Sequence, residues 1–549
     1  MYIFLISIFI TNFFYLVLGK LIFNKYFEER KNNAFESAIL GVVIASFLSL
    51  LINFFFPLNL VSNSIVYITI ILIFFLKKNN LNSKDYLFLL VSSCASFLLI
   101  LYDNEYRPDA TLYHLPYVQI LNENKIILGL SNLHSRFAHI SILQYLSAFN
   151  YNIFTKNNGI LIPLASITSF LYIYFFNDLL EFLKKRSDVS CGKLFSFIVL
   201  IYVSYKINRY SEFGNDAPAH LFLFYLISKF IYLKNYSLKN IHLTYLYSVF
   251  LFSNKVFFIF VFLIPFYMFV KNKNLKKILF SFASLILLTW FIKNILISGC
   301  AIYPLKNTCF TTLKWTDIKT VEAVHIESEA WAKAWPQNIN NNISMKEFSK
   351  NFNWVKAWSL IHLKYIIKTL VPFIIVIVFI LIFLSWKKKS KRDYDLIKLD
   401  DQKYLILLII GTLGVFSFFL KYPIYRYGYS YIILLFFIIL IKIFNKINYN
   451  NFLFASKIIF SICLITILSK QFLRIYINHD KRDFVPSHVF IDTKDFNKKY
   501  KKFMLNDNFS VYFSIGECHY GLAPCSHNKE NIINLKVQND VTYNILYNK

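Results

Sequence analysis

What the sequence lacks narrows the class of protein. It has no Gly/Ser-rich or Pro-rich linker that would separate domains, and only 12 glycines and 12 prolines among 549 residues. It has no series of alternating strands of about ten residues, which excludes an outer-membrane barrel. It also contains no Walker loop, no GxGxxG after a strand, no HExxH and no nucleophile elbow, so the catalytic folds that these motifs mark are excluded.

Acidic residues are scarce as well. The chain has 30 acidic residues against 59 lysines and arginines, which gives a formal net charge of +29. In a soluble protein this excess would suggest nucleic acid. Here the lysines gather in short clusters between apolar runs, where positive charge sets the orientation of membrane helices. We therefore expect membrane lipids, and no nucleic acid, as partners.

Long apolar runs dominate a sequence that is 57% hydrophobic and 19% aromatic. A membrane span needs about 20 apolar residues, and backbone polar groups in lipid must bond within their own helix. We predict an all-α polytopic helical bundle of about 12 to 14 spans. The expected spans are 2–23 (a first span rather than a cleavable signal), 35–56, 60–76, 86–102, 159–177, 193–207, 217–233, 278–298, 361–385, 403–420, 429–447 and 453–470.

The apolar piece 241–270 leaves two alternatives open. Basic clusters border it on both sides, so it either crosses twice, with Ser253-Asn254-Lys255 as the turn, or forms one re-entrant hairpin. Under the first count all basic clusters face one side, the cytoplasm. No cytoplasmic segment is then large enough to bind a nucleotide sugar, so we expect external, ATP-independent chemistry.

This topology divides the chain into six parts. They are N-terminal spans (1–102), a first large external loop (103–158), central spans (159–298), an external loop (299–358), C-terminal spans (359–470) and an external tail (471–549) that forms a small α/β or β-rich segment.

Four of the seven cysteines support these boundaries. They form two local pairs in expected external segments: Cys300 with Cys309, and Cys518 with Cys525. Disulfides persist in oxidising compartments, so we predict two external disulfides. A metal site is the alternative for the second pair, because His519 and His527 lie near it.

Acids open the first external loop, and another precedes a later span. Asp103, Glu105 and Asp109 follow the span that ends near residue 102, and Asp216 immediately precedes span 217–233. Asp109 and Asp216 both stand where a helix N-cap belongs. Capping or a solvated loop start accounts for such residues without function. A fixed carboxylate at the membrane surface would also suit a general base.

Cationic residues accompany these acids. Arg136 and His139 lie in GLSNLHSRFAHISIL, Arg426 lies among five tyrosines in KYPIYRYGYSY, and Lys255 stands at the expected external turn. Such groups can bind a phosphate. An interfacial amphipathic helix and an aromatic belt are the alternatives for the first two segments.

The blocks PDATLYHLPYVQIL, GLSNLHSRFAHISIL, ISGCAIYPLKNTCF, YPIYRYG and ECHYGLAPC carry a family resemblance. They resemble a family of bacterial membrane proteins similar to the GT-C class of glycosyltransferases, which includes protein mannosyltransferases, lipid A aminoarabinose transferases and oligosaccharyltransferases. The resemblance covers most of residues 100–530 and is strongest at 109–143. One departure is that the acidic loop follows the fourth expected span rather than the first.

The resemblance implies an inverting enzyme of the bacterial inner membrane. It would transfer a sugar from a polyprenyl-phosphate donor to an envelope glycan, lipid or protein on the non-cytoplasmic face. Asp109, with Asp103 or Glu105, would match the acid that activates the acceptor, and Asp216 the second acid. Arg136, Arg426, His139 and Lys255 would face the donor phosphate.

No cofactor or metal is expected to be required, although Asp103, Asp109 and Asp216 offer oxygen ligands for Mg²⁺ or Mn²⁺. The alternatives are a polysaccharide polymerase, a flippase or transporter of envelope glycans, and a non-catalytic assembly factor.

Overall fold

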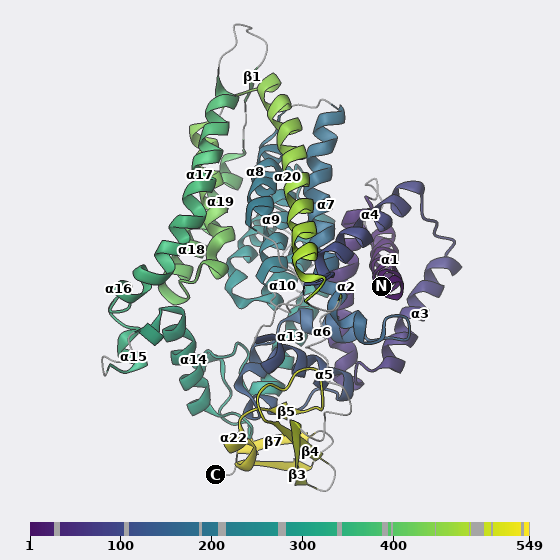
Figure 1. Ribbon diagram of the computed structural model, residues 1–549, viewed down its shortest axis with the longest axis vertical. Helices are drawn as coiled ribbons and strands as arrows, with labels where there is room; N and C mark the ends of the chain where they lie inside the picture. The colour runs from purple at the N-terminus through teal and green to yellow at the C-terminus, as the bar shows by residue number, and fades with distance from the viewer. Residues whose placement is uncertain are drawn as a thin grey trace.

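The computed structural model describes residues 1–26, 33–103, 109–185, 189–206, 216–272, 281–337, 343–386, 394–396, 399–444, 446–481, 484, 499–506, 509–539 and 543–547. These residues form a bundle of long helices, with many of the short helices and the sheets of the C-terminal tail gathered at one end (Figure 1). We call this end, at the bottom of Figure 1, the loop end.

Long helices make up the body of the bundle. They are α1 (Tyr2–Tyr26), α2 (Ala34–Phe55), α3 (Leu60–Leu76), α4 (Ser83–Ile100), α7 (Ile162–Lys185), α8 (Cys191–Lys206), α9 (Asp216–Tyr232), α10 (Leu238–Asn254), α13 (Phe282–Ser298), α17 (Lys364–Ser385), α18 (Asp401–Lys421), α19 (Tyr425–Ile443) and α20 (Tyr449–Asn478). By length and composition, 8 helices in the described chain can cross a membrane. The predicted helical bundle is confirmed, with boundaries close to those expected, but these 8 helices of the described chain are fewer than the 12 to 14 spans expected.

The short helices lie between these long ones. They are η1 (Ala110–His114), α5 (Leu115–Glu123), η2 (Leu130–Asn132), η3 (Ser135–His139), α6 (Ile142–Phe149), η4 (Lys156–Leu161), η5 (Val256–Phe262), α11 (Leu263–Asn272), η6 (Lys306–Thr308), α14 (Ile318–Ala332), α15 (Met345–Phe348), α16 (Val355–Trp358), η8 (Ser359–Leu363) and α22 (Lys529–Ile533).

The apolar piece 241–270 breaks at the expected residue. Helix α10 ends at Asn254, Lys255 adopts an extended backbone (φ −149°, ψ 122°), and η5 starts at Val256 and leads into α11. Helix α11 packs back against α10. Because α10 has 17 residues, it is about 25 Å long. That is shorter than the roughly 30 Å apolar core of a bilayer, so length does not distinguish two crossings from a re-entrant hairpin.

Helices α1 and α2 show how small residues set the packing. Gly19 of α1 lies against the Ser37 carbonyl of α2, and Gly41 of α2 lies against the Tyr15 carbonyl of α1. A Cβ at either glycine would collide with backbone oxygen on the other helix. Glycine pairs of this kind allow helix backbones to approach closely without a hydrophobic driving force between them.

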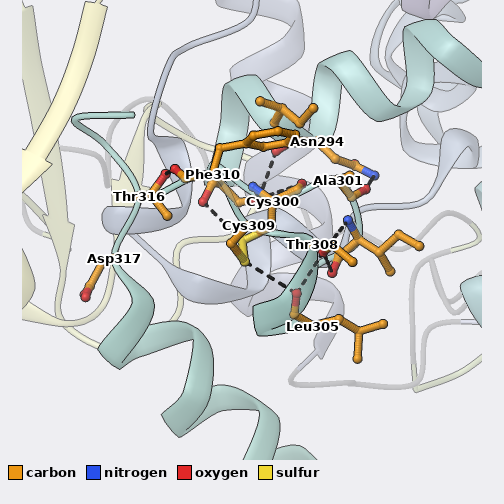
Figure 2. The surroundings of a disulfide bond; sticks show 12 residues. Asn294, Cys300, Ala301, Leu305, Thr308, Cys309, Phe310, Thr316 and Asp317 are labelled. Carbon is orange, nitrogen blue, oxygen red and sulfur yellow. Dashed lines mark hydrogen bonds between the residues drawn. A yellow bond between two sulfur atoms is a disulfide. The ribbon is translucent and has the colours of Figure 1, made fainter. Parts of the chain in front are cut away.

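Both expected cysteine pairs are disulfides. Cys300 bonds to Cys309, and Cys518 bonds to Cys525. Cys94, Cys191 and Cys463 are free. Figure 2 shows the first disulfide, which closes the loop after α13. Asn294 donates from its side chain to the Ala301 carbonyl at 2.9 Å. The loop thereby stays close to the end of α13 and leads the chain into α14.

Seven short strands complete the described chain. At the end of the bundle opposite the loop end, β1 (Tyr394–Leu396) pairs with β2 (Lys446–Asn448). In the tail, β3 (Tyr500–Asn506) and β4 (Phe509–Ser514) are antiparallel, β5 (Cys525–Ser526) runs parallel to β4, and β6 (Leu535–Asn539) pairs with β7 (Tyr543–Tyr547).

The tail is joined to the first large loop by backbone and side-chain hydrogen bonds. The Ile545 N–H donates to the Leu128 carbonyl at 2.9 Å, and the Asn132 side chain donates to the Ile545 carbonyl at 2.9 Å. Helix α20 also continues to Asn478, past the expected end at residue 470. The tail is thus β-rich, as expected, but packed against the loop rather than a separate appendage.

Candidate functional site

Residues from four separate segments converge at the loop end. They are Asp109 (immediately before η1), Asp216 (the first residue of α9), Lys255 (between α10 and η5) and Arg426 (the second residue of α19). The described chain therefore brings two of the predicted acids together with two of the predicted cations.

Asp109 precedes a π-helical turn. Its own backbone is helical (φ −57°, ψ −36°), and its side chain makes no capping hydrogen bond. The expectation that it caps a regular helix is wrong, because an N-cap residue is extended whereas the backbone of Asp109 is already helical. Pro116 bears on the π-helical turn that follows. Proline has no N–H to donate, and the Leu115 N–H bonds to the Ala110 carbonyl, five residues back. Turns of this type are rare and are frequent at functional sites.

Asp216 forms an ion pair with Lys255, and Nε of Arg426 lies 3.9 Å from Oδ2 of the same carboxylate. The side chains of Lys255 and Asp216 are 22% and 24% exposed, so water reaches the pair only in part. The start of α9 is at the position predicted from the sequence, but the carboxylate there is held by two cations.

The ring of Tyr427 supports both cations. The ammonium of Lys255 lies 4.7 Å from the ring centroid, and the guanidinium carbon of Arg426 lies 4.9 Å from it. Arg426 also donates from Nη2 to the Tyr427 hydroxyl at 2.9 Å. Cations attract the negative face of an aromatic ring, so the ring and the Asp216 carboxylate together offset the repulsion between the two positive charges.

The charge of Asp109 reaches the same groups. Burial, followed by the charge of Arg426, lowers the pKa of Lys255, while Asp109 opposes this shift. Burial, followed by the charge of Asp109, raises the pKa of Tyr113 above its ordinary range. Asp109 is itself exposed. The two acids thus differ: Asp216 is held in an ion pair, and Asp109 faces solvent beside the cations.

His114 and Arg136 border this cluster. Burial, followed by the charges of Lys255, Arg426 and Arg136, lowers the pKa of His114 to about 3, so its ring is neutral at neutral pH. The Gln144 amide nitrogen lies 3.0 Å from Nδ1 of His114. An amide nitrogen only donates, so Nδ1 accepts and the ring proton is assigned to Nε2.

The formal charges of the cluster do not cancel. Among the described residues, Arg136, a protonated Lys255 and Arg426 are three cations against the two carboxylates of Asp109 and Asp216, which leaves +1 (three minus two). A partly buried cluster with a net positive charge, whose arginine and lysine donors face solvent in part, is suited to an anionic group such as a phosphate.

Three predicted residues lie elsewhere or outside the described chain. Asp103 is 4% exposed and forms an ion pair with Arg474 of α20 at 3.7 Å. This buried pair is a structural contact and does not involve the acids and cations of the cluster. Glu105 falls within 104–108, outside the described residues. His139 packs its ring edge-on against Tyr303 of the disulfide loop at 5.0 Å, where the charge of Arg136 acts on it.

Sequence reasoning missed the aromatic members of the cluster. Tyr427 and Tyr113 contact or electrostatically influence the charged residues, as does Tyr422, whose ring lies 6.4 Å from that of Tyr427. The tyrosines of KYPIYRYGYSY were ascribed to an interfacial belt. Their closeness to Arg426 in the sequence was the available signal, because a guanidinium is attracted to aromatic ring faces within about 6 Å.

Metal ligation finds little support in the geometry. In the part of the chain that the structure describes, no three His, Cys, Asp or Glu side chains are grouped so that they could hold a metal ion. Asp103, one of the three oxygen donors considered, is paired with Arg474. Asp216 is paired with Lys255, which would have to be displaced before a cation could bind.

A comparison with known protein families identifies the family of this chain. Residues 1–433 match the family described as "Domain of unknown function (DUF8201)". The chain belongs to this family. The part of this DUF8201 protein that matches contains Asp109, Asp216, Lys255 and Arg426, and it ends within α19. No curated protein and no solved structure matches the chain.

Proposed function

We propose that this DUF8201 protein is a polytopic membrane glycosyltransferase of GT-C type. It would transfer a sugar from a polyprenyl-phosphate donor to an acceptor of the cell envelope. The observation that carries the proposal is the meeting of Asp109 and Asp216 with Lys255 and Arg426 at one end of a helical bundle. Acids and cations in one partly buried cluster suit a reaction that takes a proton from one group and releases a phosphate from another.

A membrane location is supported by the outer surface of the bundle. Large apolar side chains of α17 and α20 are exposed, including Phe379 at 68% and Ile465 at 62%. Water disfavours so large an apolar surface, whereas lipid does not. The basic clusters between spans then orient the loop end away from the cytoplasm, in a bacterial inner membrane.

Asp109 is the stronger candidate for the base. It is exposed beside the cations, whereas Asp216 is held by Lys255 and Arg426. In the proposed step, an acceptor hydroxyl or amine attacks the anomeric carbon of the sugar. The bond between that carbon and the phosphate oxygen breaks, polyprenyl phosphate leaves with the electron pair, and Asp109 takes the acceptor proton.

Lys255 and Arg426 are proposed to receive the leaving phosphate, and Arg136 adds to the positive charge. Preorganised cations stabilise negative charge as it develops on the leaving oxygen. Asp216 would set the positions of these two side chains through its ion pair. This account requires no metal, so transfer should continue in the presence of EDTA.

The test is sugar transfer by purified protein in lipid nanodiscs. A panel of radiolabelled polyprenyl-phosphate hexoses and pentoses is offered with an envelope extract as acceptor. We expect transfer by the native chain and a loss of at least about 100-fold in Asp109→Asn, which removes the base. Asp317→Asn is the matched control, since Asp317 only caps α14. Full activity of Asp109→Asn would refute the assignment of the base.

The alternative functions are distinguished by the product formed and by a second assay in proteoliposomes. There a flippase or transporter would move the lipid-linked sugar across the membrane without forming a new glycosidic bond. A polymerase would use a lipid-linked glycan as both donor and acceptor. An assembly factor would tolerate Asp109→Asn, Asp216→Asn and Asp103→Asn together.

A further inference from the structure

The C-terminal tail contacts the turn that carries Asp109. Its segment Glu517–Tyr520, which we call the clasp, lies against η1 and α5, although several hundred residues separate them in sequence. The clasp belongs to the part of the chain outside residues 1–433. Its contacts involve backbone and side chains, and each meets a specific need of the π-helical turn.

The first contact is a hydrogen bond from the clasp to a backbone carbonyl of the turn, that of Thr111. The N–H of Leu115, four residues after Thr111, bonds to Ala110 instead. Residue 116, five residues after Thr111, is proline and has no N–H. Neither the α-helical nor the π-helical donor is therefore available to the Thr111 carbonyl. The His519 N–H supplies the hydrogen bond, at 2.8 Å.

This contact matters because Thr111 is fully buried, with 0% of its surface exposed. A buried carbonyl without a donor is strongly disfavoured, since water cannot replace the missing bond. His519 has a positive φ of 52°, a conformation that residues other than glycine adopt rarely. The clasp is thus bent in the way needed to direct this N–H at the turn.

Two side-chain contacts reinforce the first. The Thr111 hydroxyl donates to the Glu517 carboxylate. At the other end of α5, the Tyr520 hydroxyl donates to Oδ1 of Asn122 at 3.1 Å. The clasp therefore holds both ends of the helical unit η1–α5, and Asp109 immediately precedes that unit.

The clasp is itself held by the tail. The disulfide between Cys518 and Cys525 joins its middle to β5. The Ser514 hydroxyl at the end of β4 donates to the Glu517 carbonyl at 2.9 Å, and the Tyr500 hydroxyl of β3 donates to the Cys518 carbonyl. The small sheet and the disulfide thus fix the segment that bonds to Thr111.

We propose that the clasp is a positioning element for Asp109, with Glu517 and His519 as positioning residues acting through Thr111. The role in transfer rests on the proposed function, whereas the effect on the turn does not. Without the clasp, Thr111 would lose the His519 donor to its buried carbonyl and the Glu517 acceptor of its hydroxyl, and the turn would be freer to move Asp109 relative to Lys255 and Arg426.

Hydrogen exchange measures the effect on the turn without any assumption about activity. The perturbed protein is the full chain with Cys518→Ala and Cys525→Ala, in nanodiscs. We expect the amides of residues 110–123 to exchange about tenfold faster or more, because the local opening becomes easier. The matched control, Cys300→Ala with Cys309→Ala, removes a disulfide that closes a different loop. It should leave 110–123 unchanged.

Two results would overturn the positioning role. One is unchanged exchange at 110–123 in the Cys518/Cys525 variant. The other is equal acceleration in both disulfide variants. The amides of α7 serve as a folding check, and a variant in which they also exchange faster is replaced by Thr111→Val. That variant removes only the hydroxyl that donates to Glu517. For Thr111→Val, too, unchanged amide exchange at residues 110–123 would overturn the positioning role.

Kinetics test the consequence for transfer. We expect Thr111→Val and Glu517→Ala each to lower kcat about tenfold with a nearly constant KM for the donor, because a small displacement of a catalytic group affects the chemical step. Thr111→Ser should restore kcat, and the double variant should be no worse than either single variant. Faster exchange with unchanged kcat would overturn the link to Asp109. Absence of transfer in the native chain would instead contradict the proposed function.

Discussion

Replacing Lys255 with glutamine tests the charge balance of the cluster. The change removes one of three cations, so the formal net charge falls from +1 (three minus two) to zero (two minus two). A phosphate about 5 Å from an ammonium gains about 3 kcal/mol at an effective dielectric of about 20. Because Lys255 is 22% exposed and paired with Asp216, screening reduces this gain to about 1–2 kcal/mol.

That energy corresponds to a loss of affinity for phosphate of about 5- to 30-fold. The probe is undecaprenyl phosphate, the lipid that the proposed reaction releases, and its binding to the protein in nanodiscs is measured by native mass spectrometry. The measurement needs no knowledge of the sugar. Lys306→Gln is the matched control. Lys306 lies on the disulfide loop, is 55% exposed and pairs with Glu322 of α14.

A second substitution makes the test stricter. Lys255→Gln combined with Asp216→Asn removes one charge of each sign, so the net charge returns to +1 (two minus one). If net charge governs phosphate binding, the double variant binds undecaprenyl phosphate more tightly than Lys255→Gln alone. Equal or weaker binding by the double variant, or unchanged binding by Lys255→Gln, would refute the reasoning.

Two further predictions concern stability. Asp103→Asn leaves Arg474 without its buried carboxylate, so we expect unfolding to become easier by about 1–3 kcal/mol, measured as a lower Tm, with unchanged binding of undecaprenyl phosphate. The folded pKa of His114 is about 3, below the ordinary value of 6.5. Between these values the unfolded chain binds a proton that the folded chain does not, so stability falls as the pH falls below 6.5. His114→Asn should reduce this loss of Tm between pH 6.5 and pH 5, and an unaltered pH dependence would contradict it.

Hydropathy predicted the bundle well because a helix in lipid must satisfy its own backbone and expose apolar side chains. The pattern located even the break at Lys255, where an ionisable residue interrupts an apolar run. The same pattern did not predict the end of α20, because this helix continues to Asn478 through a more polar sequence. A helix can leave the apolar region without ending, so composition alone does not give its last residue.

The candidate site was predicted in part. Asp109, Asp216, Lys255 and Arg426 were singled out, and they converge. The geometry around Asp109 was not foreseen, although Pro116 was visible in the sequence. A proline that near a helix start is ordinarily accommodated in the first turn. Here the turn begins earlier, so the same proline stands where a π-helical turn would donate an N–H to the Thr111 carbonyl.

Long-range partners explain the remaining differences. Asp103 was grouped with Asp109 because they are close in sequence, yet its partner Arg474 comes from α20. The tail was predicted to be β-rich, but its bond from His519 to Thr111 is between backbone groups. No side-chain pattern encodes a contact of that kind, so only the folded chain reveals it.

The most direct test of the proposed site is a structure of the protein with undecaprenyl phosphate bound. The account predicts a phosphate in contact with Lys255 and Arg426, with Asp109 facing it across the space where a sugar and an acceptor would meet. A hollow of about 530 Å³ lies apart from this cluster, lined in part by Lys156 and Asn157. A phosphate bound there, with the Lys255–Asp216 pair unoccupied, would contradict the account.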